Sequence, residues 1–166
     1  MRNYEISFHD GRKIASSLSS WLIVDRTTKR IQRPDEILMQ YNTEDQPAPL
    51  DRSSVKLPAS DESGKLSHTF NVKISDLDIN LHTNNANYIK WVTDTYDLNF
   101  ITNHQPCSAE INYLAESMFN DEIVIRTSPD PEDNNFYDHS VIRKNDEKEL
   151  CRIRIQWKKR ITNPGK

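Results

Sequence analysis

Apolar and polar residues alternate along most of the second half of the chain. Over Leu150–Lys158 nearly every second residue is apolar, and charged or amide residues occupy the positions between. This period of two is typical of a β-strand with one buried face and one wet, basic face. The same reasoning predicts four further strands, over His68–Ile74, Ser108–Glu116, Glu122–Thr127 and His139–Arg143. Turns are expected at Phe119–Asp121 and Asn145–Asp146, and an acidic loop over Pro129–Asp138.

A helical period follows the first of these strands. Apolar and aromatic residues recur at three- and four-residue steps up to about Asp97, which predicts an amphipathic helix. These residues are Tyr88, Ile89, Val92 and Tyr96. Asn84 or Asn85 suits the N-cap, because an asparagine side chain can accept a hydrogen bond from a free N–H of the first turn. A strand, one helix and then a run of antiparallel strands indicate an α+β domain with the helix packed on a curled sheet.

The N-terminal part predicts a β-hairpin over Tyr4–Val24, because Asp10–Gly11 is a strong turn signal between two segments rich in β-forming residues. Two strands alone cannot bury a core, so this hairpin has to pack against other material. Pro34 suits the first position of a short helix over Pro34–Tyr41. Residues 42–67 are rich in Pro, Ser, Asp and Glu, and we expect them to form a linker.

Composition narrows the classes of function. The 22 basic and 25 acidic residues give a net charge of −3, which argues against a general nucleic-acid binder that neutralises phosphates. The sequence has no apolar run long enough for a membrane span and no signal peptide, so we expect a cytoplasmic protein. Cys107 and Cys151 lie far apart and fit no metal or redox spacing, which favours two reduced thiols. We expect no cofactor and no metal ion.

Charged residues are unevenly distributed along the chain. Basic residues cluster within Arg26–Arg33 and Arg152–Arg160, and acidic residues within Asp130–Asp138 and Asp146–Glu149. Such runs usually form a solvated face. The alternative interpretation is that the basic clusters form a docking surface for an acidic partner.

The segment Ser75–Trp91 concentrates polar residues between the first predicted strand of the second half and the helix. Calcium binding is one interpretation, because D-x-D-x-N, starting at Asp76, matches the opening of an EF-hand loop. The sixth position is Leu81, where that loop needs Gly, and the twelfth is Asn87, where it needs Glu. A second interpretation is structural, since Asp and Asn favour turns and helix caps.

The third interpretation is hydrolytic. Asp78, Asn80 and His82 are spaced by two, and in an extended segment this spacing directs the three side chains to one side. They would lie beside a helix N-terminus, whose free N–H groups can stabilise an oxyanion. An acid, a carboxamide and an imidazole are the groups needed to activate water against a carbonyl. Because no Ser or Cys lies in a nucleophile-elbow motif, direct attack by water is favoured over an acyl-enzyme.

The same segment resembles a known family. Asp76–Asn85 reads D-L-D-I-N-L-H-T-N-N and runs into Tyr88-Ile89-x-Trp91, and it is similar to the D-L-D-x-N-x-H-x-N-N signature of the acyl-acyl-carrier-protein (acyl-ACP) thioesterases. Other segments resemble that family in order and spacing: Ser20–Asp25, Ile111–Ser117 and Cys151–Trp157. These enzymes of fatty acid biosynthesis release fatty acids from the carrier.

The resemblance implies a fold of two hotdog domains in tandem, each a long helix wrapped by a curled antiparallel sheet. Residues 1–41 would hold the terminal strands and short helix of an incomplete N-terminal hotdog domain, 42–67 the linker, and 68–166 the C-terminal hotdog domain with the catalytic loop. Because hotdog domains bury sheet and helix surfaces against one another, a homo-oligomer is expected.

The resemblance also implies hydrolysis of fatty acyl-ACP thioesters by water, at Asp78, Asn80, His82 and Glu116, with acyl carrier protein as the partner. Asp78 would orient Asn80 and His82, and Glu116 would act as general base or as the partner of His82. Asn80 and the amides near Asn84 would bind the oxyanion. Two alternatives stay open. One is a truncated, non-catalytic hotdog module for carrier binding or assembly, and the other is an acyl-CoA thioesterase or hydratase.

One position departs from the plant members of the family. They carry Glu-Cys where this chain has Glu116-Ser117. A role that depends on a thiol therefore does not transfer to this chain, whereas the role of the glutamate does.

Overall fold

The computed structural model describes residues 1–25, 27–28, 30–33, 50, 56–59 and 65–161. The chain divides into two compact units, Met1–Val55 and Lys56–Lys166. The helix predicted over Pro34–Tyr41 lies outside the described residues, as does most of the predicted linker over 42–67. No helix of the described chain is long and apolar enough to cross a membrane.

The first unit contains the predicted hairpin. Strands β1 (Arg2–Ser7) and β2 (Lys13–Ser19) pair antiparallel. Gly11 in the connecting turn has a φ of +83°, a left-handed value that glycine adopts without steric cost. Every residue of β1 is exposed, in keeping with the expectation that two strands bury no core.

The second arm of this hairpin is shorter than predicted. It was expected to continue to Val24, but β2 ends at Ser19, and a separate pair of strands follows, β3 (Ile23–Val24) with β4 (Ile31–Gln32). The Asp25 carboxylate accepts hydrogen bonds from the N–H groups of Thr27 (3.0 Å) and Thr28 (2.6 Å), and these bonds start a turn directly after β3.

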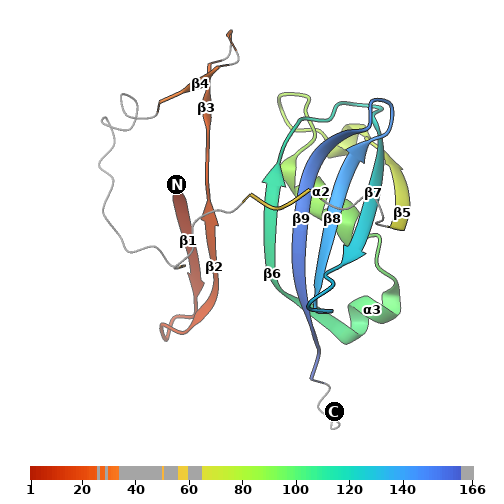
Figure 1. The fold of residues 1–166 in the computed structure, drawn as a ribbon. Coiled ribbons are helices and arrows are strands. Elements are labelled where there is room, and N and C mark those ends of the chain that lie inside the picture. The colour runs from red at the N-terminus through yellow and green to blue at the C-terminus, as the bar shows by residue number, and fades with distance from the viewer. Residues whose placement is uncertain (26, 29, 34–49, 51–55, 60–64, 162–166) are drawn as a thin grey trace. The chain divides into compact units, whose positions relative to one another are not determined.

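The second unit is a five-stranded antiparallel sheet with one helix against its face (Figure 1). Its strands are β5 (Lys65–Asn71), β6 (His104–Tyr113), β7 (Glu122–Pro129), β8 (Phe136–Arg143) and β9 (Lys148–Lys159), and its order is β5-β7-β8-β9-β6. A short 3-10 helix, η1 (Ile74–Asp76), precedes the main helix α2 (Asn85–Thr93), and α3 (Leu98–Asn103) leads into β6. The predicted α+β architecture is confirmed.

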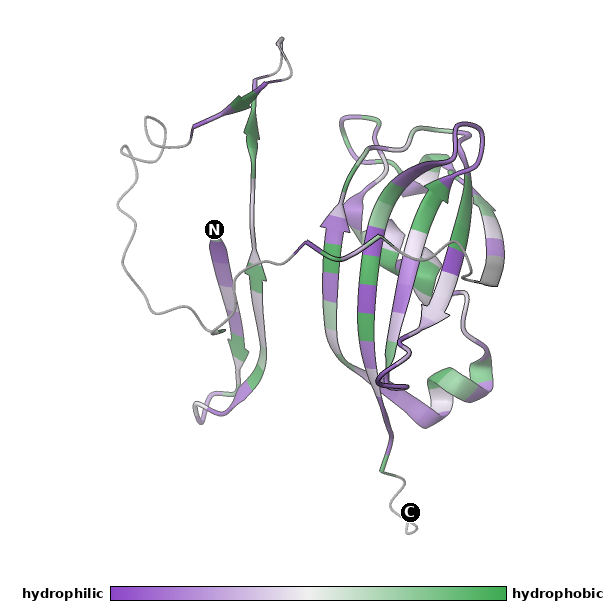
Figure 2. Ribbon diagram, in the orientation of Figure 1, coloured by the Kyte–Doolittle hydropathy of each residue, from purple (hydrophilic) through white to green (hydrophobic). Residues whose placement is uncertain are grey.

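The core lies between α2 and the sheet. Figure 2 shows the alternation of hydrophobic and hydrophilic residues along β9, and the residues buried from that strand are Cys151, Ile153, Ile155 and Trp157. They pack with residues of α2 and the neighbouring strands: Tyr88, Trp91, Val92, Ile123, Ile125, Val141 and Leu150. Burial raises the pKa of the Cys151 thiol to about 12. Both cysteines are unpaired.

Several element boundaries differ from the sequence prediction, and β8 begins at Phe136, inside the acidic loop expected over Pro129–Asp138. The strand expected over His68–Ile74 covers Lys65–Asn71, and Ile74 begins η1 with its side chain exposed. The helix expected to reach Asp97 ends at Thr93. The Asp97 carboxylate instead caps α3, which was not predicted, by accepting a hydrogen bond from Phe100 N (2.7 Å).

A buried histidine lies within the core. His139 is 1% exposed, and its Nε2 and Nδ1 lie 2.9 Å from Tyr96 Oη and 3.0 Å from Thr127 Oγ1. Trp157 Nε1 donates to the same Tyr96 oxygen (3.1 Å), which leaves the tyrosine proton for His139 Nε2. His139 is then neutral, with its proton on Nδ1. Burial lowers its pKa to about 4.

Candidate active site

Residues Asp78–His82 form a tight turn and not the extended segment assumed from the sequence. Asp78 Oδ1 accepts hydrogen bonds from the N–H groups of Asn80 (2.8 Å) and His82 (3.2 Å), and Asp78 N donates to His82 O (2.8 Å). Leu81 has a φ of 62°, in the left-handed region that is strained for a non-glycine residue. A short Asp side chain can replace strand pairing by such local bonds. Because the segment is not extended, a spacing of two no longer predicts a common side for the three side chains, and Asp78 shapes the loop.

Asp76, the other acid of the loop, connects its start to the helix. Its side chain is buried, and Oδ2 accepts a hydrogen bond from Lys73 N (2.9 Å). Its carbonyl oxygen accepts from Asn84 N (2.8 Å) and from Asn87 Nδ2 (2.8 Å). These contacts fix the position of the loop relative to the first turn of α2, so Asp76 has a structural role.

The helix begins with the predicted cap. Asn84 Oδ1 accepts a hydrogen bond from Ala86 N (3.0 Å). Asn84 N and Asn87 N also have acceptors, the carbonyl oxygens of Asp76 and Asn84. Three of the amides near Asn84 are therefore already engaged and are poor candidates for an oxyanion site. The Asn80 side chain is exposed and makes no hydrogen bond to the described part of the chain, so its carboxamide can bind a ligand.

His82 and Glu116 come together from distant parts of the sequence. His82 Nδ1 and Glu116 Oε1 lie 3.6 Å apart. This separation exceeds a hydrogen bond, and a small rotation or a bridging water would connect the two groups. The His82 side chain is 34% exposed and that of Glu116 is 67% exposed. Both groups can therefore reach a substrate from solvent.

Backbone pairing holds the end of the polar loop beside the segment that carries Glu116. His82 forms an isolated antiparallel bridge with Met118, and Thr83 N donates to Ser117 O (3.0 Å). Glu116 was predicted on a strand, but β6 ends at Tyr113. Glu116 belongs to the connection between β6 and β7, where the chain leaves the sheet and passes the loop.

Ser117 is buried and bridges this connection to the loop and to α2. Its side chain is 0% exposed, and its Oγ donates to Thr83 Oγ1 (2.7 Å). Tyr88 Oη lies 3.0 Å from the same Oγ, and because the serine proton is directed to Thr83, Tyr88 is the donor of this bond. Burial raises the pKa of Tyr88, so its hydroxyl stays protonated. Ser117 is thus shielded from solvent and is not placed as a nucleophile.

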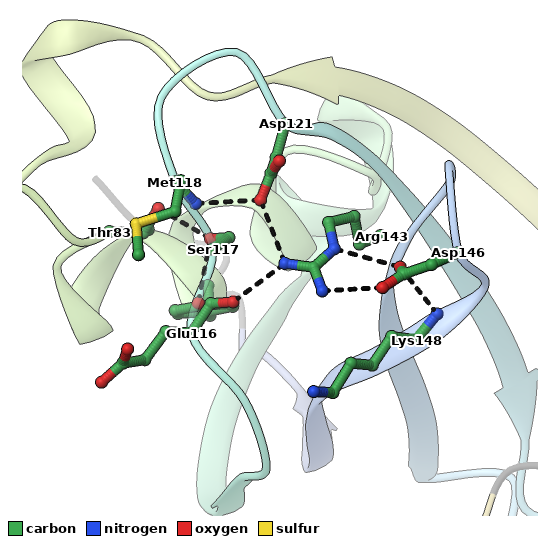
Figure 3. Close-up of polar contacts among 9 residues, drawn as sticks. Thr83, Glu116, Ser117, Met118, Asp121, Arg143, Asp146 and Lys148 are labelled. Atoms are coloured by element: carbon green, nitrogen blue, oxygen red, sulfur yellow. Dashed lines mark hydrogen bonds and ion pairs between the residues drawn. The ribbon is translucent and has the colours of Figure 1, made fainter.

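Arg143, on β8, also holds the connection between β6 and β7 in place (Figure 3). Its Nη1 contacts Glu116 O (3.3 Å) and Asp121 Oδ2 (3.4 Å), and its Nε and Nη2 bind the Asp146 carboxylate at 3.0 and 2.8 Å. Asp121 Oδ2 also accepts from Met118 N (2.9 Å). The bonds from Arg143 lower the pKa of Asp146 to about 2. In Figure 3 the Glu116 carboxylate points away from this network, which holds its backbone and leaves its side chain free.

His82 and Glu116 were predicted from the sequence, but the residues that support them were not. Ser117 and Arg143 are distant in sequence from the polar loop, and each acts through contacts that only the folded sheet creates. The identity of Ser117 as a small polar residue beside Glu116 was the one available signal. Within the described ranges, no three His, Cys, Asp or Glu side chains gather as metal ligands.

In the predicted basic cluster Arg152–Arg160, both of the first two arginines form ion pairs within the second unit. Arg152 binds Glu149 Oε2 through Nη2 (2.6 Å), and Arg154 binds the carboxylates of Asp138 (2.7 Å) and Asp130 (3.1 Å). These arginines balance acids of the same unit. Lys158, Lys159 and Arg160 follow, and the described chain offers none of these three an acidic partner. Two residues of the other cluster, at positions 26 and 29, lie outside the described residues.

Known proteins resemble this chain in sequence. Residues 59–159 match the model of the acyl-ACP thioesterase C-terminal domain family. The palmitoyl-acyl carrier protein thioesterase of Cuphea hookeriana, named as chloroplastic, is 24% identical over 156 residues, which cover 89% of this chain and 37% of the relative. The chloroplastic oleoyl-acyl carrier protein thioesterase 2 of Arabidopsis thaliana is 26% identical over 180 residues, covering 90% of this chain and 49% of the relative.

Solved structures show the same fold. An acyl-ACP thioesterase from Bacteroides thetaiotaomicron superposes with a TM-score of 0.73 at 24% identity, over 94% of this chain and 61% of that one. The 12:0-ACP thioesterase from Umbellularia californica has a TM-score of 0.70 at 22% identity, over 82% of this chain and 53% of that one. The hotdog fold implied by the resemblance is confirmed.

These relatives are longer than this chain. The chain spans between 37% and 61% of the length of the four relatives named above. The family model nevertheless covers most of it, from residue 59 to residue 159. On that match, the chain belongs to the acyl-ACP thioesterase family.

Proposed function

We propose that this chain carries the catalytic loop of a hydrolase that cleaves fatty acyl-ACP thioesters to free fatty acid and carrier protein. The observation that carries the proposal is the approach of His82 Nδ1 to Glu116 Oε1 at 3.6 Å. The exposed Asn80 belongs to the same turn as His82, two residues before it. The family of the chain supplies the reaction class. The pair supplies a base, and the carboxamide supplies a hydrogen-bond donor for the oxyanion.

In the proposed mechanism His82 is the general base. Its Nδ1 faces Glu116, so its Nε2 is available to take a proton from water, and imidazole is the commonest base near neutral pH. The Glu116 carboxylate orients the ring and stabilises the imidazolium. The water oxygen bonds to the thioester carbonyl carbon, and the Asn80 Nδ2 group donates to the resulting oxyanion. When the carbon–sulfur bond breaks, the imidazolium returns the proton to the leaving thiolate, giving acid and thiol.

In this mechanism Asp78 does not react but holds Asn80 and His82 in position. Its carboxylate is occupied by the N–H groups of Asn80 and His82, and it fixes the turn from which both side chains project. Loss of these bonds would displace the oxyanion donor and the base together. Asp78 is therefore proposed as a positioning residue.

The proposed partner is an acyl carrier protein. Lys158, Lys159 and Arg160 offer cations that are not neutralised by the described chain, and these would attract an acidic carrier. Complementary charge of this kind speeds association and is screened by salt. The apparent affinity for acyl-ACP should fall as ionic strength rises, and an affinity that is indifferent to salt would exclude this role for the cations.

A non-catalytic module is the second candidate function. The chain covers 37% to 61% of the relatives' lengths, so a complete acyl-binding surface can require residues that the relatives have and this chain does not match. Such a module would bind the carrier without turnover. Carrier binding in the absence of hydrolysis, by this chain alone, would favour it.

The substrate class is tested by comparing two thioesters of the same acyl chain, one on carrier protein and one on CoA. The proposal expects release of fatty acid from acyl-ACP at a clearly higher kcat/KM than from acyl-CoA. The reverse preference would favour the acyl-CoA alternative. Absence of hydrolysis with both would favour the module.

Two further proposals concern assembly and location. Strand β6 lies at one edge of the described sheet, and edge strands are common places for two chains to pair, so we expect a homo-oligomer by light scattering. From the sequence we also propose a cytoplasmic location for this chain. The plant relatives, by contrast, are named as chloroplastic. Fractionation of cells that express the chain tests the location.

A further inference from the structure

An apolar cavity lies at the other end of α2 from the candidate active site. Its volume is about 190 Å³. With a rise of about 1.5 Å per residue, Thr93 in its wall lies about 12 Å along the helix from Asn85, which follows the catalytic loop. The walls come from α2, α3, β6 and β9, and they include Ile89, Ile101, Ala109, Ile155 and Trp157. The chemistry of the wall suits an alkyl chain.

The rim of this cavity carries a fixed cation. Arg160 lines it, and Arg160 N and Nε donate to the carbonyl oxygens of Asn103 (2.7 Å) and His104 (2.9 Å). The two terminal Nη groups have no hydrogen-bond or ionic partner in the part of the chain that the structure describes. A guanidinium with its fork free is suited to a carboxylate, which it can bind through two parallel bonds.

The surface around Arg160 is positive. A shallow hollow next to the cavity is lined by Arg160 together with Gln105, Lys158, Lys159 and Ile161. An apolar cavity that opens beside such a surface matches an amphiphile with an apolar tail and an anionic head. A cavity of about 150 Å³ holds benzene, so this one has room for about six to eight carbons.

We propose that this cavity binds a medium-chain fatty acid anion, with the alkyl tail between α2 and β6 and the carboxylate on Arg160. The site is distinct from the His82–Glu116 pair, and the assignment does not rest on the proposed catalysis. If the chain is a thioesterase, this ligand is chemically the same as its product, a free fatty acid. The site would then become occupied as that product accumulates.

Calorimetric titration of the whole chain with the series from hexanoate to dodecanoate tests the cavity. Each added methylene should tighten Kd by about fourfold while it enters the cavity, and the gain should stop once about eight carbons are buried. Octan-1-ol should bind at least about tenfold more weakly than octanoate, because it lacks the charge that the guanidinium recognises. Equal affinity for octanol and octanoate would overturn the proposal, as would the absence of saturable binding.

Two variants locate the ligand. Ala109→Phe fills the cavity from the exposed edge strand β6 and should abolish octanoate binding. Ser108→Phe places the same side chain on the opposite face of that strand, where Ser108 pairs with Gln156, and should leave Kd unchanged. Arg160→Gln should weaken octanoate at least about tenfold and leave octanol unchanged.

The oligomeric state of each variant separates a ligand site from an interface between copies. If Ala109→Phe binds octanoate normally but alters the oligomer, the groove is an interface and the proposal is wrong. Because octanoate binding is read without turnover, a chain that binds octanoate but hydrolyses no thioester contradicts only the proposed function. A chain that hydrolyses acyl-ACP but binds no octanoate contradicts only this inference.

Discussion

His82 Nδ1 and Glu116 Oε1 lie 3.6 Å apart across two connections, the loop before α2 and the segment after β6. Neither side chain belongs to the apolar core. Glu116→Gln keeps the size of the side chain but removes the charge that would stabilise the His82 imidazolium. Turnover of acyl-ACP should fall about a hundredfold, with an unchanged thermal midpoint.

Glu132→Gln is the matched control for this variant, because Glu132 is exposed in the loop between β7 and β8. It should hydrolyse acyl-ACP at the wild-type rate. Equal rates in the Glu116→Gln and Glu132→Gln proteins would remove Glu116 from the mechanism.

The Asp78 carboxylate stabilises the loop, because its Oδ1 accepts hydrogen bonds from the N–H groups of Asn80 and His82. Asp78→Asn keeps an acceptor oxygen and should retain most of the activity, whereas Asp78→Ala loses the turn and should lower kcat about a hundredfold or more. Steady-state kinetics of both variants tests the assignment. An equal loss in both would indicate that the charge of Asp78 acts on the substrate.

The buried hydroxyl of Ser117 links Thr83 and Tyr88. Ser117→Ala leaves both partners without this bond inside the fold and should lower the free energy of unfolding by about 1–3 kcal/mol, as measured by urea denaturation. Ser108→Ala, on the exposed part of β6, should change it little. Turnover per folded molecule should persist in Ser117→Ala, and a complete loss of turnover would indicate a chemical role for Ser117.

Arg143 contacts the backbone of Glu116 and the carboxylates of Asp121 and Asp146. Arg143→Gln should release the connection and lower kcat about tenfold, since small displacements of a base reduce turnover strongly. Arg143→Lys should restore part of that loss. Lys144→Gln removes the neighbouring ion pair with Glu122 (2.6 Å) and should leave kcat unchanged. An effect of the same size in Lys144→Gln would show that Arg143 has no special part in positioning.

His139 predicts a specific dependence of stability on pH. Its pKa is lowered to about 4 in the folded protein by burial, against about 6.5 in an unfolded chain. The unfolded chain therefore binds a proton as pH falls below about 6.5, while the folded core does not. The stability is fully present above that pH and is lost as pH falls toward 4, by about 3 kcal/mol from this group.

The His139→Gln protein isolates this contribution, because every other titrating group is retained. Its free energy of unfolding, measured by urea from neutral pH to about pH 4, should decline less steeply than that of the wild type. Parallel curves for the two proteins would show that His139 is not the group responsible.

Strand patterns were the most predictable part of the fold. The near alternation over Leu150–Lys158 predicted β9 with one buried face, because a strand with one buried face has apolar residues at every second position. Cys151, Ile153, Ile155 and Trp157 are buried on that face. The cap at Asn84 was predictable for a similar reason, since capping is local chemistry. The end of α2 and the start of α3 were not, because the Asp97 cap competes with continuation of a helix whose apolar period extends to Tyr96.

The structure brings two of the predicted site residues together, His82 and Glu116, but the geometry of the loop was not predictable from the sequence. The resemblance to a family suggested His82 through the polar loop and Glu116 through the separate segment Ile111–Ser117. The assumption of an extended loop was wrong, because the Asp78 side chain bonds to its own backbone neighbours. The contacts of Ser117 and Arg143 depend on the pairing of β6, β8 and β9, which no local pattern reveals.

The role of His82 and Glu116 is best tested by hydrolysis of an acyl-ACP thioester by the purified chain, measured as release of free fatty acid and compared with the His82→Ala and Glu116→Gln proteins. The wild type should hydrolyse the thioester and each variant should lose about a hundredfold or more in turnover, with all three proteins equally folded. Wild-type rates in both variants would contradict this role.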